Sequence, residues 1–287
     1  PRRYSFPIAH AFVMRHRVAP NHALLTDLLP DLIRNYEAWE TGWTVHNRKV
    51  GLRDNGLFYQ FDHADGSEVS IAGHGLRPTI NSYMYGDAKA IAEIARMAGD
   101  EEQAGRFEAK AASLKRLVQE KLWDKEAGFF MVMPEEGEPL RDVRELWGYL
   151  PWLVDLPDPG YEIAWKQLMD PKGFYAPFGP TFAEQRHPRF TISYEGHECQ
   201  WNGPSWPLAT SPTLTALANL LNDYDQDVIG KEDYFETLRI YTKCHQLTRE
   251  DGKVVPWIDE NINPYTGDWI ARTRLMAWQK EDPELFE

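Results

Sequence analysis

The sequence predicts an all-α protein built from packed helical hairpins. In several stretches, apolar residues recur at steps of three and four, which places them on one face of a helix. Short links alternate with long segments rich in Gly, Pro and aromatic residues, as expected for helices stacked in pairs. No shift of composition divides the 287 residues. We therefore expect a single domain, 1–287, with a sizeable core.

The helical pattern is clearest in the first half of the chain. Leu25, Leu29 and Leu32 share one face of 21–40, where Pro30 predicts a kink. Two more helices follow at 80–98 and 101–122, separated by a Gly-Asp pair that suits a helix end and the cap of the next helix. Further helices are expected at 6–18, 141–154, 160–169, 205–222, 231–248 and 269–280.

Long segments separate the helix pairs, and one of them has the pattern of a β-hairpin at 123–132. In a barrel of hairpins, such loops gather on one face and carry function. The chain starts without Met and enters a helix at once, so we expect an N-terminal truncation that removes targeting information. The long segments are 41–79, 123–140, 171–204 and 249–268.

Composition and charge narrow the classes of partner. A net charge of −13 disfavours nucleic acid and anionic membrane surfaces. No apolar run reaches the roughly 20 residues that span a bilayer. Aromatic residues make up 13% of the chain, with 11 Trp. Most of them are expected to fill the core, and others to stack on the apolar faces of sugar rings.

The two cysteines, Cys199 and Cys244, have no CxxC spacing and no neighbouring His cluster. This pattern predicts no metal site, and pairing of the two thiols stays open. Oligomeric state and localisation are likewise open.

The first long loop concentrates titratable residues. Asp62, Asp65 and Glu68 lie within a few residues of His63. Acids in loops are most often solvated turn residues. Glu68, however, follows an Asp-Gly turn and precedes apolar residues, so partial burial would raise its pKa and keep it protonated for use as a general acid.

The third and fourth long loops offer sugar-binding and basic groups. Trp201 and Trp206 flank an Asn-Gly-Pro turn that contains Asn202. This is either a packed helix start or a wall of indole faces and an amide for hydroxyl groups. In the fourth loop, Glu260 precedes an Asn-Pro-Tyr-Thr-Gly turn, where an ionised carboxylate suits a general base.

These segments resemble, in order, the loops of glycoside hydrolase family 63 type enzymes, including mannosylglycerate-hydrolase-like and processing-glucosidase-like members. The Asp-Gly-Ser-Glu-Val-Ser stretch of 65–70 stands where that family carries its general acid, and 81–85 resembles the next helix start. The Trp-Asn-Gly-Pro-Ser-Trp stretch of 201–206 resembles a Trp-Arg-Gly-Pro-x-Trp signature. The segment 260–267 resembles the family's general-base segment, and 145–152 resembles another loop near the sugar.

The resemblance implies an (α/α)6 toroid of six hairpins, as in trehalases and glucoamylases, with small β-hairpins in its loops. Four hairpins and one extra helix are expected here, so the chain would be the C-terminal portion of such a domain. It also implies an inverting, exo-acting glycosidase for an α-linked glucoside or mannoside, with Glu68 as acid and Glu260 as base. No cofactor, metal, nucleic acid or membrane is implied. The implied sugar-binding residues are Tyr59, Asp65, Trp147, Trp201, Asn202 and Trp206.

The chain departs from the family pattern at two positions. Glu68 stands where the family has Asp, which leaves Asp65 and Asp62 open as alternative acids, and Asn202 stands where it has Arg. Three other readings also remain open. One is a catalytically inactive carbohydrate-binding toroid, and another is a helical-repeat scaffold. The third is a six-hairpin lyase or epimerase, for which the loop imidazoles His63, His74 and His197 would be candidate bases.

Overall fold

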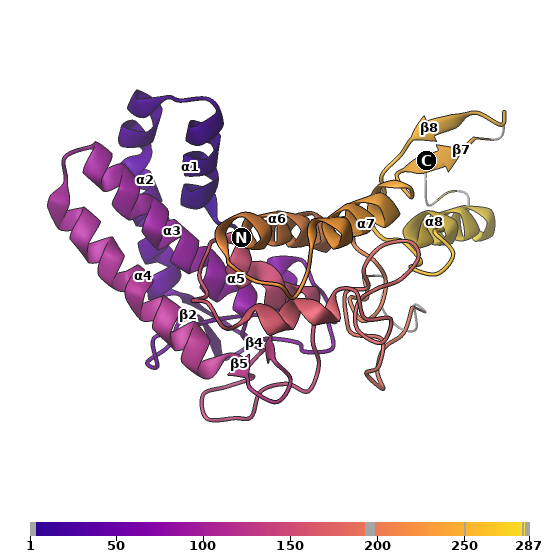
Figure 1. Ribbon diagram of the computed structural model, residues 1–287, viewed down its shortest axis with the longest axis horizontal. Helices are drawn as coiled ribbons and strands as arrows, with labels where there is room; N and C mark the ends of the chain where they lie inside the picture. The colour runs from indigo at the N-terminus through magenta and orange to yellow at the C-terminus, as the bar shows by residue number, and fades with distance from the viewer. Residues whose placement is uncertain (1–3, 193–198, 250, 283, 285–287) are drawn as a thin grey trace.

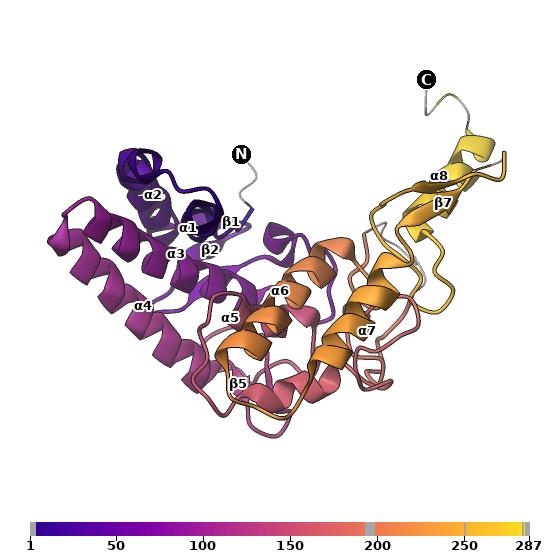
Figure 2. The same ribbon diagram turned by 45° about the horizontal axis from the view of Figure 1, so that its top comes forward.

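Within residues 4–192, 199–249, 251–282 and 284, which the computed structural model describes, the chain forms eight α-helices along an open arc. Figures 1 and 2 show the first two helices at one end of the arc and the last helix at the other. The helices are α1 (Ile8–Val18), α2 (His22–Thr41), α3 (Pro78–Met97), α4 (Glu101–Lys121), α5 (Leu150–Leu153), α6 (Pro207–Asp223), α7 (Lys231–Thr242) and α8 (Ile270–Glu281).

The helices of the first half begin and end close to their predicted limits. The apolar face of α2 is buried at Leu25, Leu29 and Leu32, and Pro30 lies inside the helix. At the start of α4, the Asp100 carboxylate accepts the Gln103 N–H at 3.0 Å. Such a cap satisfies one of the backbone donors that a helix start leaves without an intrahelical acceptor.

Helices α1 and α2 form one hairpin, and α3 and α4 form the next (Figure 1). Helices α1 and α3 run in the same direction, since Asp87 accepts the His10 N–H at 3.0 Å and Glu93 pairs with Arg17 at 3.7 Å. Asp87 is buried and also accepts the N–H groups of Ile8 and Ala9. A carboxylate of α3 therefore caps the start of α1.

Three predicted helices differ in the structure. The helix predicted over 141–154 is wrong in its first part, because Arg141 and Leu146 donate their N–H groups to Val132 and Phe182. Only a 3-10 turn at Leu146–Tyr149 and the short α5 are helical there. The segment 160–169 forms a 3-10 helix at Glu162–Gln167. The helix predicted over 231–248 ends at Thr242, and a strand follows it.

The long segments contain more β-structure than expected. The segment 41–79 folds into an antiparallel four-stranded sheet of order β1-β2-β3-β4, with Trp43 opposite Val50 and Tyr59 opposite Leu76. The predicted hairpin at 123–132 is confirmed as β5–β6. The strands are β1 (Trp43–Val45), β2 (Arg48–Leu52), β3 (Phe58–Gln60), β4 (Gly75–Leu76), β5 (Trp123–Asp124), β6 (Phe129–Phe130), β7 (Gln246–Thr248) and β8 (Val254–Pro256).

Aromatic side chains fill the centre of the arc. Trp152 and Trp165 are fully buried with ring centroids 5.5 Å apart, and Tyr149 stacks on Trp165 at 4.1 Å. Edge-to-face and offset contacts of this kind add to the burial of large apolar areas. In the described part of the chain, none of the helices has the length and apolarity that a bilayer crossing requires.

Candidate active site

Each of the three loops singled out in the sequence leads directly into the start of a helix. The first loop ends at Arg77, just before α3. The loop with Trp201 ends at Trp206, before α6, and the loop with Glu260 ends at Trp269, before α8. Helix starts carry unpaired N–H groups and a partial positive charge, which suit carboxylate-rich loops.

Backbone hydrogen bonds join the three loops. Ser205 and Ile262 exchange both of their backbone hydrogen bonds, at 3.0 and 2.8 Å. The Trp201 N–H donates to the Glu68 carbonyl oxygen at 3.2 Å. The loop of Trp201 and Ser205 therefore lies between the loops of the two predicted catalytic residues.

The Cys199 thiol lies where the loops of the two glutamates meet. Its Sγ donates to Glu260 Oε1 at 3.4 Å, and two residues further on the Trp201 N–H donates to the Glu68 carbonyl oxygen. Burial raises the pKa of the Cys199 thiol to about 11, with further upward contributions from Glu260, by charge and hydrogen bond, and from the charge of Glu68. The loop of Cys199 therefore contacts the Glu260 side chain and the backbone at Glu68.

Asp65 is a structural carboxylate. Its Oδ2 accepts from Arg77 Nε at 2.7 Å and from Gln60 Nε2 at 2.9 Å, and it also accepts from the Thr79 hydroxyl. Its Oδ1 accepts from the Ser67 hydroxyl, and the side chain has no exposed surface. Because its lone pairs are occupied by protein donors, the structure argues against Asp65 as the acid and as a sugar contact.

The remaining titratable residues of the first loop lie at its outer edge. Asp62 accepts the His63 N–H at 2.8 Å. The imidazoles of His63 and His74 both contact Phe61, with ring centroids at 5.4 and 5.2 Å. Burial lowers the pKa of His74. The third imidazole considered as a base, His197, lies outside the described residues.

The three predicted stacking tryptophans pack on one another. Trp201 stacks on Trp206 at 3.9 Å and lies 6.0 Å from Trp147, and each of the three side chains is 2% exposed. In this arrangement they form a buried indole stack beneath the loops. Their indole N–H groups have no acceptor among the residues that the structure describes, which is unusual for buried tryptophan.

The other two predicted sugar contacts are Asn202, which lies in a loop, and Tyr59, which lies in a strand. Asn202 is half-buried in the site's central loop, with its amide 3.4 Å from Gln200 Oε1. Next to it, Gly203 packs so closely on the Thr191 carbonyl that a Cβ would collide with the oxygen. Tyr59 lies in β3, fully buried, and its hydroxyl accepts from Arg48 at 3.0 Å. Tyr59 is therefore a buried residue of the sheet, with its hydroxyl bound to Arg48.

Sequence reasoning missed the roles of three residues at this site. Cys199 was considered only for a disulfide, whereas both cysteines are thiols in the structure. Arg77 and Glu145 are buried charges beside the acid's loop, 0% and 4% exposed. Glu145 stood at the head of a segment with family resemblance, and an arginine between a short strand and a helix start, as Arg77 is, was a weak signal of a buried ion pair.

A cavity of about 550 Å³ adjoins the first loop. It touches Asp65 and Gly66 and is walled by Trp147, Tyr83 and Leu208. Its size is in the range of small-molecule sites. This cavity meets both the acid's loop and the indole stack.

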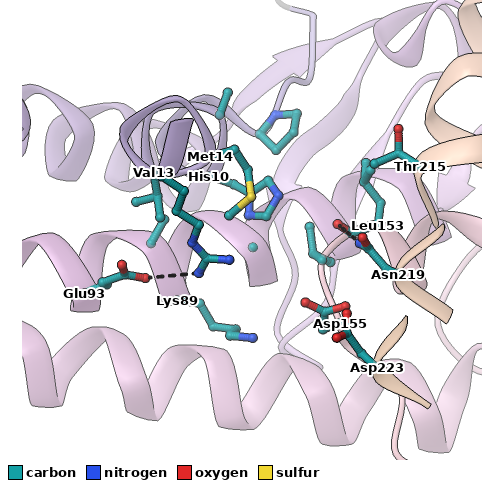
Figure 3. A pocket seen from close by; sticks show the side chains of 16 residues that line it. His10, Val13, Met14, Lys89, Glu93, Leu153, Asp155, Thr215, Asn219 and Asp223 are labelled. Atoms are coloured by element: carbon teal, nitrogen blue, oxygen red, sulfur yellow. Dashed lines mark hydrogen bonds and ion pairs between the residues drawn. The ribbon is translucent and has the colours of Figure 1, made fainter. Parts of the chain in front are cut away.

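A second cavity, of about 420 Å³, lies between α1, α3 and α6 (Figure 3). Figure 3 shows Lys89, Asp155 and Asp223 facing it. Burial lowers the pKa of His10 to about 4, and burial raises that of Asp155, with a further upward contribution from Asp223. None of its lining residues belongs to the loops of Glu68, Trp201 or Glu260, and it adjoins the first cavity at Pro7 and Leu153.

No group of three or more His, Cys, Asp or Glu with metal-binding geometry occurs among the residues described. The titratable side chains that a hydrogen bond joins across these loops are the Cys199 thiol and the Glu260 carboxylate.

Comparisons with known proteins show the family and the fold of the chain. A family model described as "Mannosylglycerate hydrolase MGH1-like glycoside hydrolase domain" matches residues 1–278. A solved structure named "Sialidase" is 39% identical, with a TM-score of 0.84 over 94% of this chain. This chain spans 24% of that protein's length. The GH63 mannosylglycerate hydrolase from Thermus thermophilus, solved in complex with glucose, is 14% identical, with a TM-score of 0.66 over 93% of this chain and 71% of its own.

Proposed function

The chain belongs to the mannosylglycerate hydrolase MGH1-like glycoside hydrolase family, and on that premise we propose that it is an inverting glycoside hydrolase with Glu68 as acid and Glu260 as base. Its fold is helix-rich and similar to that of a GH63 enzyme. The proposal includes membership of these helices in an (α/α)6 toroid, of which residues 1–287 supply an arc.

One observation carries the proposal: a single loop joins the two glutamates, because its Cys199 thiol donates to Glu260 Oε1 at 3.4 Å and its Trp201 N–H donates to the Glu68 carbonyl oxygen at 3.2 Å. Inverting glycosidases place two carboxyl groups roughly 6.5–9.5 Å apart, so that a water fits between the base and the sugar. The proposal requires such a spacing between Glu68 and Glu260.

In the proposed mechanism, Glu68 protonates the leaving-group oxygen and Glu260 takes a proton from the attacking water. Bond cleavage passes through a transition state of oxocarbenium character. Glu260 is exposed, so water reaches the carboxylate that acts as the base. Glu68 is half-buried. In the proposed complex, the bound sugar displaces water from the part of its side chain that is exposed.

The proposed substrate is an α-linked glucoside or mannoside. Support comes from the family's name and from the fold similarity to an enzyme solved with glucose. The name "Sialidase" of the 39% identical protein indicates a second substrate class, although the match covers only 24% of that protein. A sialoside therefore belongs in the test.

The test is hydrolysis of aryl α-glucosides, α-mannosides and α-sialosides, with the anomer of the first product followed by NMR. Glu260→Gln on any of these substrates, and Glu68→Gln on those with a poor leaving group, are each expected to lower kcat by about 10²–10⁴-fold while the fold stays intact by circular dichroism. The first product is expected to have the β configuration.

Asp155→Asn is the matched control, because Asp155 lines the second cavity and lies outside the three loops, so its loss should leave hydrolysis unchanged. Normal turnover by Glu260→Gln would show that the base is assigned wrongly. Loss of activity in Asp155→Asn alone would move the active site to the cavity of Figure 3.

A further inference from the structure

The loop that carries Glu68 is wrapped around one buried guanidinium group. Arg77 has no exposed surface. It donates from Nε to Asp65 Oδ2 at 2.7 Å and from Nη2 to Ser67 Oγ at 2.8 Å. Its Nη1 donates to the Gly73 carbonyl oxygen and lies 3.5 Å from Ser70 Oγ. One side chain thus contacts the loop at four residues. Asp65 and Ser67 precede Glu68, and Ser70 and Gly73 follow it.

The backbone beside Glu68 is in an unfavourable conformation. Val69 has a φ of 57°, in the left-handed region that β-branched residues avoid. Its side chain is 46% exposed, so apolar packing offsets little of this strain. Strained residues persist where the surroundings over-determine them, and they cluster at active sites. The Arg77 bonds to Ser67 and Ser70 enclose the Glu68–Val69 pair and supply that restraint.

A second buried carboxyl group holds the far end of the same loop. Glu145 Oε1 accepts the Ala72 N–H at 2.8 Å. Its Oε2 lies 3.7 Å from Arg77 Nη2 and makes no hydrogen bond with the described residues. Glu145 is 4% exposed. It is therefore a buried charge partner of Arg77 that is also hydrogen-bonded to the acid's loop.

We propose that Arg77 is the positioning residue for the acid Glu68, clamping the strained turn from Ser67 to Ser70, and that Glu145 holds this clamp through Ala72 and Arg77. The inference rests on the proposed role of Glu68. None of these residues touches the substrate. They fix the direction in which the Glu68 carboxyl group is presented, and a small displacement of a catalytic group costs rate steeply.

The test compares two aryl glycosides of the preferred sugar that differ only in the leaving group. A nitrophenol leaves without protonation, whereas a poor leaving group needs the acid. Ser67→Ala and Ser70→Ala each remove one Arg77 contact. We expect kcat/KM to fall about 10-fold or more for the poor leaving group and less than about 3-fold for the nitrophenol.

The matched control is Thr79→Val, which removes a different hydrogen bond to Asp65 in the same buried network but does not touch the turn. It is expected to lower the melting temperature and to change kcat/KM equally for the two leaving groups. Glu145→Ala should lower kcat/KM more for the poor leaving group than for the nitrophenol. Glu145→Gln keeps an acceptor for the Ala72 N–H and should therefore retain most of the parent kcat/KM.

Two failures are distinguishable. If Glu68→Gln itself shows no leaving-group dependence, Glu68 is not the acid and the proposed function is wrong. If Glu68→Gln shows it, but Ser67→Ala and Ser70→Ala slow both substrates equally and in step with their melting temperatures, the role is purely structural and the positioning inference is overturned.

Discussion

The Cys199 thiol donates a hydrogen bond to Glu260 Oε1 over 3.4 Å. Burial and two negative charges keep it in the thiol form, with a pKa of about 11. Cys199 therefore marks the place where the loops of the proposed acid and base meet.

This contact predicts slow, substrate-protected alkylation of Cys199. At pH 8 about one thiol in a thousand is ionised when the pKa is near 11, and only the thiolate reacts. Labelling by iodoacetamide should therefore speed up steeply with pH and abolish hydrolysis when it occurs. Mass spectrometry of labelled protein checks this, with Cys199→Ser as the control that keeps a donor and resists inactivation. Fast labelling at pH 7, or full activity after labelling, would contradict the assignment.

Val69→Asn should stabilise the protein. Asn tolerates the left-handed conformation that Val69 adopts at φ 57°, and the strain relieved is on the order of 1 kcal/mol. Thermal unfolding measures the change, with activity expected to be retained. The control is Val254→Asn in the exposed strand β8, which should be neutral or destabilising because Asn disfavours strands. A melting temperature that falls in both variants would argue against strain at Val69.

Glu145 should make stability fall as pH rises. Burial raises its pKa from 4.5 to about 7, against the lowering effects of Arg77 and the Ala72 N–H. A carboxyl group with a raised folded pKa stabilises fully below its unfolded pKa, and that contribution is lost as pH rises toward 7. The loss is on the order of 3 kcal/mol. Urea unfolding at pH 5 and pH 8 should show a smaller difference for Glu145→Gln than for the parent, and equal differences would contradict this.

Asp87→Ala should destabilise the first turn of α1. The substitution leaves the N–H groups of Ile8, Ala9 and His10 without their carboxylate acceptor, which costs about 1–2 kcal/mol for a helix cap. Hydrogen exchange at these amides should rise strongly while amides inside α4 stay protected. Asp87→Asn, which keeps an acceptor oxygen, should show a smaller increase. Uniform loss of protection in both helices would mean that Asp87 supports the whole fold and not the α1 cap.

The regular helices could be predicted because their signals are local. The apolar face of 21–40 and the Asp100 cap depend on residues within one or two turns of each other, and the structure confirms both. The helix predicted over 141–154 failed for a non-local reason. Its backbone donors find acceptors at Val132 and Phe182, and tertiary hydrogen bonds of this kind override a helical pattern.

Some features of the candidate site could likewise be predicted from the sequence, and others depend on the fold. The sequence alone predicted the three loops and offered Glu68 and Glu260 as candidate carboxylates, because loop position and residue type can be read from the sequence. It left Asp65 open as the acid, since only the fold brings Arg77, Gln60 and Thr79 onto its oxygens. The buried indole stack of Trp201 and Trp206 likewise depends on packing.

By itself, the sequence predicted a helix-rich chain with titratable residues gathered in long loops before helix starts. The tertiary structure alone decided which donors and charges surround each of these carboxylates. The physical reason is that a carboxylate's role depends on the donors and charges within a few ångströms. At this site those neighbours, Arg77 for Asp65 and Cys199 for Glu260, come from positions in the chain whose spatial proximity only folding creates.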